Sequence, residues 1–107
     1  DPYAGLPSNA CGGFHLKVAN NRASAVKVTV NGDHSFDVGA GETVAMAEWL
    51  PPPYGLNLAV PWDVVISDAQ SGEQLFVATM PGPVDQKVTL SDSAPVQTAY
   101  SLIAEGC

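Results

Sequence analysis

Short runs of alternating apolar and polar residues recur along most of the chain, with turn-forming residues between them. Val26, Val28 and Val30 alternate with Lys27 and Thr29, which is typical of a β-strand with one buried face. The same period predicts strands near residues 14–18, 36–38, 43–49, 62–66, 75–80, 88–90 and 100–104. No long window keeps a helical period free of Gly or Pro, apart from residues 43–50, where β-branched and aromatic residues favour a strand.

Seven or eight short strands with frequent turns predict an all-β fold, an antiparallel two-sheet β-sandwich. Alternation, in place of continuous apolar runs, argues against a parallel sheet. The architecture resembles that of immunoglobulin and fibronectin type III domains, and the resemblance is one of architecture alone. We expect an irregular N-terminal arm over residues 1–13, rich in Gly, Pro, Ser and Asn, and a single sandwich domain over residues 14–107.

An Asn-Gly pair after the valine strand predicts a hairpin turn. A two-residue loop would place the polar side chains of the next strand on the valine face, because the register would be wrong by one residue. A three-residue loop of residues 31–33 pairs Val28 with Phe36 and Val26 with Val38. We therefore predict the three-residue loop or an equivalent bulge.

The two cysteines, Cys11 and Cys107, lie near opposite ends of the chain and belong to no C-x-x-C motif. We expect them to form one disulfide that ties the termini together, with two buried free thiols as the alternative. In the chain-entropy model, closing a loop of about 100 residues stabilises a domain by about 4.7 kcal/mol. Because disulfides persist in oxidising compartments, we expect a secreted, extracellular or cell-surface protein. The start at Asp1 in place of Met fits a processed product that has lost its signal peptide.

Charge narrows the choice of partners. Four Lys and Arg residues face 11 Asp and Glu residues, which gives a formal net charge of −7. Phosphate backbones and anionic lipid headgroups require basic clusters, so nucleic acid and anionic membrane surfaces are disfavoured. No continuous apolar run is long enough to predict a transmembrane helix. The basic residues and the turn carboxylates read as solvated surface: Lys17, Arg22, Lys27, Lys87, Asp33, Asp37, Asp68, Glu73, Asp85 and Asp92.

An aromatic and proline-rich segment, residues 49–62, is the most unusual part of the sequence. Consecutive prolines favour a stiff polyproline II stretch, which loses little entropy on binding. Trp and Tyr are enriched at binding hot spots. The predicted binding residues are Trp49, Pro52, Pro53, Tyr54 and Asn57. Trp62 is in phase with Val64 and Ile66, so we assign it to the core; the alternative for the whole segment is a plain crossover between the sheets.

Catalytic and metal sites have weak support. The chain lacks the G-x-S-x-G, H-E-x-x-H and P-loop motifs, so we predict neither enzymatic activity nor a cofactor. The residue types that copper uses are present, but nothing in the sequence groups them: His15, reading as a surface residue, His34 at a turn, and Met46 and Met80 in the core. Oxygen ligands for calcium also occur near one turn, where ordinary solvation explains them equally well: Asn31, Asp33 and Asp37.

Taken together, these features predict a small secreted, non-catalytic binding module that acts through residues 49–62, with Tyr54 as its anchor. A protein partner is favoured over a carbohydrate, and the sequence gives no oligomeric state. The alternatives are a structural spacer domain of a larger surface protein and a small secreted inhibitor. Copper or calcium binding is a weaker alternative.

Overall fold

The computed structural model describes residues 14–47, 61–82 and 84–100, and within these ranges every regular element is a β-strand. The strands are β1 (His15–Asn20), β2 (Val26–Val30), β3 (His34–Val38), β4 (Thr43–Ala47), β5 (Trp62–Asp68), β6 (Gln74–Met80), β7 (Asp85–Leu90) and β8 (Val96–Tyr100). No helix in the described residues is long and apolar enough to cross a membrane.

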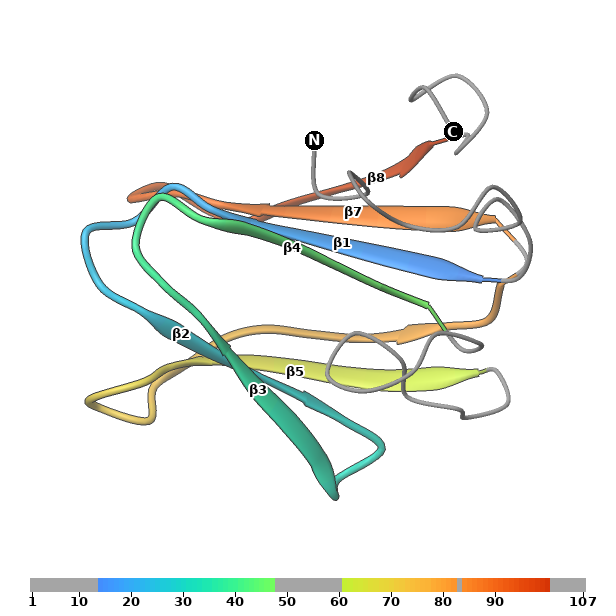
Figure 1. The fold of residues 1–107 in the computed structure, drawn as a ribbon, viewed down its shortest axis with the longest axis horizontal. Helices are drawn as coiled ribbons and strands as arrows, with labels where there is room; N and C mark the ends of the chain where they lie inside the picture. The colour runs from blue at the N-terminus through green and yellow to red at the C-terminus, as the bar shows by residue number, and fades with distance from the viewer. Residues whose placement is uncertain (1–13, 48–60, 83, 101–107) are drawn as a thin grey trace.

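Two four-stranded sheets form the two layers of the molecule (Figure 1). Sheet A has the strand order β4-β1-β7-β8, and sheet B has the order β3-β2-β5-β6. The apolar faces of the two sheets enclose one core, whose buried members are Phe14, Leu16, Val18, Val26, Val28, Val30, Val38, Met46, Trp62, Val64, Ile66, Met80, Val88 and Leu90. The predicted all-β, two-sheet sandwich is confirmed at this level.

Trp62, the first residue of β5, has the largest fully buried side chain among the described residues. Its side chain is fully buried, and its ring meets that of Phe14 edge to face, with 4.9 Å between centroids and an interplanar angle of 84°. Such an arrangement places the positive edge of one ring against the negative face of the other. Met46 and Met80 are also fully buried. The prediction that Trp62 and both methionines belong to the core is confirmed.

The β2–β3 hairpin has the predicted register. Val28 pairs with Phe36 and Val26 pairs with Val38, which leaves a loop of residues 31–33. Asn31 adopts a φ of 54° and Gly32 a φ of 78°. Glycine and asparagine tolerate this left-handed backbone best, so their presence explains why the chain turns here.

One strand pair departs from the antiparallel expectation, because β1 and β7 run parallel in the middle of sheet A. Every residue of β1 is buried, on the outer face of the sheet as well as on the core face. Parallel pairing is characteristic of strands covered on both faces. The sequence hides this burial because the outer face of β1 carries the polar residues His15 and Lys17.

The last described strand also differs from the expectation, which began a strand at Tyr100. In the described residues β8 spans Val96–Tyr100, so it begins four residues before the predicted start at Tyr100. Four of its five side chains are exposed, which leaves no alternation of burial for a hydrophobic pattern to follow. Residues 101–104 of the predicted strand lie outside the described residues.

Candidate functional site

The predicted binding residues lie outside the part of the chain that the structure describes. They are Trp49, Pro52, Pro53, Tyr54 and Asn57. The same holds for Cys11 and Cys107, so the disulfide stays a prediction. The structure does describe the strands that flank the binding segment, and these define where it joins the sandwich.

Both flanks of the segment lie at one end of the sandwich, which we call the loop end. β4 stops at Ala47, which pairs with His15 at the start of β1. β5 starts at Trp62, whose ring packs on Phe14, the residue just before β1. Strands β1, β5 and β7 all begin at this end (Figure 1). The 14-residue connection of residues 48–61 therefore joins sheet A to sheet B between two positions fixed by strand pairing and core packing.

A buried polar pair, His15 with Asp85, also lies at the loop end. The backbone N–H of His15 donates to Asp85 Oδ1 at 2.9 Å, and the ring Nδ1 lies 3.1 Å from the same oxygen. His15 is fully buried and Asp85 is 8% exposed. The prediction of a surface histidine and a solvated turn carboxylate is therefore wrong. The pair fastens the first residue of β1 to the first residue of β7, where the two parallel strands begin.

Lys17 is the second buried polar residue on the outer face of β1, with 4% of its surface exposed. Its Nζ lies 5.0 Å from the centroid of the Tyr100 ring on β8, a cation–π distance. The sequence placed Lys17 on the outward side of the strand, which is confirmed by the register, but the expectation that it is solvated is wrong. Of the other basic residues, Lys27 is exposed, as predicted, whereas Arg22 and Lys87 are half-buried.

The His15–Asp85 and Lys17–Tyr100 contacts together involve four residues of sheet A. We call these four residues the outer-face cluster. A histidine with a carboxylate on Nδ1 is the arrangement that orients a general base in hydrolases. Here, however, the carboxylate also holds the histidine's own backbone N–H, and both side chains are buried. We therefore interpret the outer-face cluster as structural, with contacts that hold β1, β7 and β8 together.

The candidate metal ligands are not gathered by the described strands. His15 is bonded to Asp85 in sheet A, whereas His34 lies in β3 of sheet B beside Asp33, with 3.4 Å between Nε2 and Oδ1. The amide of Asn31, a candidate calcium ligand, accepts the backbone N–H of Asp63 at 2.8 Å. Within residues 14–47, 61–82 and 84–100, no group of three or more His, Cys, Asp or Glu side chains could hold a metal ion.

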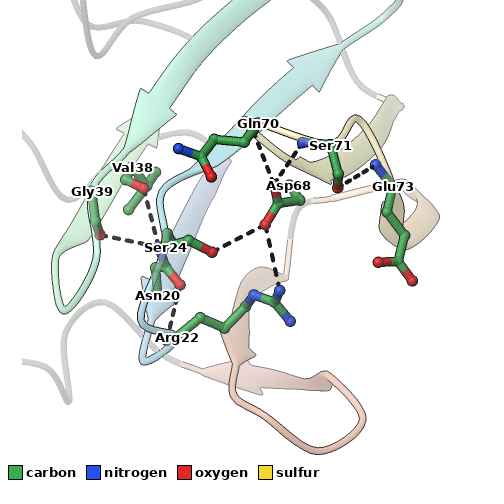
Figure 2. A network of polar contacts seen from close by, with 9 residues as sticks. All are labelled: Asn20, Arg22, Ser24, Val38, Gly39, Asp68, Gln70, Ser71 and Glu73. Carbon is green, nitrogen blue, oxygen red and sulfur yellow. Dashed lines mark hydrogen bonds and ion pairs between the residues drawn. The ribbon is translucent and has the colours of Figure 1, made fainter.

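At the opposite end of the sandwich, which we call the turn end, a polar network is centred on Asn20 and Asp68 (Figure 2). Asn20 is fully buried. Its Nδ2 lies within 2.9–3.1 Å of the carbonyl oxygens of Ser24, Val38 and Gly39, and its Oδ1 accepts the backbone N–H of Arg22 at 3.1 Å. One amide side chain thus links the β1–β2 connection to the end of β3.

Asp68 closes the other half of the network at the end of β5. Its Oδ1 accepts the backbone N–H groups of Gln70 and Ser71, each at 2.9 Å, and its Oδ2 accepts the hydroxyl of Ser24 at 3.0 Å. The guanidinium of Arg22 lies 3.5 Å from Oδ2. These hydrogen bonds, that of the Ser71 N–H foremost, lower the pKa of Asp68 to about 2. The prediction that Asp68 is a solvated turn carboxylate is therefore wrong, because its oxygens accept hydrogen bonds from the chain and only 8% of the residue is exposed.

Sequence reasoning missed both polar constellations for different reasons. Asn20 follows the strand predicted near residues 14–18, and Asn or Asp side chains at such a turn often bond nearby backbone groups. Asp68 before a Ser-Gly turn carries the same signal. No local signal links His15 to Asp85, because the contact spans 70 positions and depends on the parallel pairing of β1 with β7.

Comparison with known proteins adds no relative: no family model, curated protein or solved structure matches this chain.

Proposed function

We propose that this chain is a small secreted, non-catalytic binding module that contacts a protein partner through residues 49–62 at the loop end. The observation that supports the proposal is the fixed position of both flanks of that segment. Ala47 is held by strand pairing, and Trp62 by complete burial in the core. A long connection between two rigidly held strand ends is a common place for binding residues on a β-sandwich.

The composition of the segment fits recognition of a protein surface. Its consecutive prolines limit the conformations that must be lost on binding, and Trp49 and Tyr54 provide large amphipathic rings. In this proposal the two four-stranded sheets serve as an immunoglobulin-like scaffold in the architectural sense only. The Cys11–Cys107 disulfide and the oxidising compartment belong to the same proposal.

Affinity capture from an extracellular fraction tests the binding role, with the chain and its Tyr54→Ala variant as baits. Gln70→Ala is the matched control, since Gln70 is exposed at the turn end. We expect Tyr54→Ala to lose a partner that the native chain and Gln70→Ala both retain, with equal melting temperatures for all three. If all three baits capture the same proteins, the binding role of the segment is wrong and the spacer alternative takes its place.

A thiol titration on unfolded, unreduced protein tests the disulfide separately. We expect no free thiol before reduction and two after it, since the chain has two cysteines. Two free thiols before reduction would overturn the disulfide and remove the argument for an oxidising compartment. The binding role would still stand or fall on the capture experiment alone.

A further inference from the structure

The Asn31-Gly32 pair in the β2–β3 loop combines two residue types that can react with each other. The backbone nitrogen of a glycine can attack the side-chain amide of a preceding asparagine, because glycine has no Cβ to hinder the approach. Asn31-Gly32 is the single Asn-Gly pair of the sequence. Both residues are exposed, and a Cβ built on Gly32 would meet no atom within 4 Å. Solvent therefore reaches the atoms that would react.

The side chain of Asn31 is held in a way that polarises its carbonyl group. The Asn31 N–H donates to the Asp63 carbonyl oxygen at 2.9 Å, and the Asp63 N–H donates to Asn31 Oδ1 at 2.8 Å. The two residues continue the β2–β5 ladder beyond Val30 and Val64, with a side-chain carbonyl in place of a backbone one. A fixed N–H at a carbonyl oxygen stabilises the negative charge that develops there during attack. The Asp63 N–H therefore activates Asn31 Cγ.

The attacking nitrogen and the leaving nitrogen are not held by other bonds. Among the described residues, neither the Gly32 N–H nor Asn31 Nδ2 has a hydrogen-bond partner. Gly32 has a φ of 78°. Glycine populates positive and negative φ about equally, so the peptide unit between the two residues can rotate at low cost and bring the nitrogen to Cγ. Asn20 provides the contrast, because its amide is buried and donates to three carbonyl oxygens.

We propose that Asn31 is a site of spontaneous deamidation in the folded chain, with water as the co-reactant. Hydroxide removes the Gly32 amide proton, and the nitrogen forms a bond to Asn31 Cγ. The bond from Cγ to Nδ2 breaks, and Nδ2 takes a proton from water and leaves as ammonia, which regenerates the hydroxide and leaves a succinimide ring. Water then adds to one carbonyl carbon of the ring and breaks its bond to the ring nitrogen. Opening at Cγ gives aspartate at position 31, and opening at the backbone carbonyl gives isoaspartate.

Both products change the chain next to the proposed binding segment. Each replaces a neutral amide by a carboxylate, which changes the net charge from −7 to −8. The new charge lies beside Asp63, which directly follows Trp62, the last residue of that segment. Isoaspartate also carries the main chain through an additional methylene, which disturbs a register set by loop length. The chemistry of the site does not depend on the binding role of residues 49–62.

Incubation of the full chain in mildly alkaline buffer made with heavy-oxygen water tests the proposal. Peptide mapping by mass spectrometry follows each asparagine, because deamidation raises the mass and the water leaves its oxygen label in the product. Fragmentation locates the converted residue and separates aspartate from isoaspartate. Asn21, which is exposed and followed by Arg22, is the control within the native chain.

The matched variant is Gly32→Asn. Asparagine tolerates a positive φ better than most residues, and the space around Gly32 accepts its Cβ. The loop should therefore keep its shape, while the new side chain hinders the attack of the backbone nitrogen. Circular dichroism and the melting temperature check that the variant folds. The comparison of Asn31 with Asn21 in the native chain needs no variant and decides the matter if Gly32→Asn does not fold.

We expect Asn31 of the native chain to react at least about tenfold faster than Asn21 and than Asn31 of Gly32→Asn, a difference of about 1.4 kcal/mol in activation free energy. Labelled aspartate and isoaspartate should both appear at position 31. A smaller ratio in either comparison overturns the proposal. The rate at Asn31 in urea-unfolded chain should exceed the rate in the folded chain by less than about tenfold. A larger excess would show that the reaction requires unfolding, and it would also overturn the proposal.

Discussion

The most exacting test of the fold is the replacement of Asn20 by alanine. The Asn20 amide has two hydrogens, which three carbonyl oxygens share at 2.9–3.1 Å, and its oxygen accepts the Arg22 N–H. Alanine removes about three hydrogen bonds, each of which contributes about 1 kcal/mol to stability. The bond to the Val38 carbonyl is buried, so its loss costs more than the average. We expect Asn20→Ala to lower the free energy of unfolding by about 3–4 kcal/mol.

Urea unfolding followed by tryptophan fluorescence measures this change, because Trp62 is buried in the core. A loss of about 3–4 kcal/mol is a large fraction of the 5–15 kcal/mol of a typical domain. The control is Asn21→Ala, which changes the next residue, an exposed one, and should stay within about 0.5 kcal/mol of the native chain. A loss below about 1 kcal/mol for Asn20→Ala would show that water replaces the network and would refute this reasoning.

Two further predictions concern acid stability and the core. The pKa of Asp68 is about 2 in the folded chain, below its value of about 3.9 in unfolded chains, so its stabilising contribution is complete above about pH 4 and is lost as pH falls toward 2. Asp68→Asn should therefore flatten the acid side of the stability profile measured by urea unfolding, and identical profiles would contradict this. Trp62→Ala should cost about 3–5 kcal/mol of unfolding free energy, because it removes a fully buried ring that packs on Phe14. The exposed neighbour Pro61→Ala is its control, and similar costs for the two would show that Trp62 is not central to the core.

The sequence pattern predicts strands well where the two faces of a strand differ in burial. In β2 and β5, buried residues alternate with more exposed ones; the apolar letters of β2 follow the same alternation, and those of β5 depart from it only at Val65 and Asp68. The predicted register of the β2–β3 hairpin depends on that contrast and is confirmed. A period of two therefore reports a difference between faces.

Where that difference is absent, the pattern is uninformative or misleading. β1 is buried on both faces, and its outer polar residues His15 and Lys17 made it read as half-solvated. Their partners, Asp85 and Tyr100, come from β7 and β8, far along the chain. β8 shows the opposite case, since most of its side chains are exposed on both faces. Both errors follow from tertiary surroundings that no local window contains.

The two ends of the sandwich differ in how their polar groups are used, and this difference bears on where a partner binds. At the turn end, Asn20 and Asp68 hold the backbone groups of three connections through bonds within the chain. A partner at that end would have to compete with these satisfied hydrogen bonds, which is costly for buried polar groups. At the loop end, β4 and β5, the two strands that flank the predicted binding segment, are held by strand pairing and core packing. The capture experiment with Tyr54→Ala and Gln70→Ala compares these two ends directly.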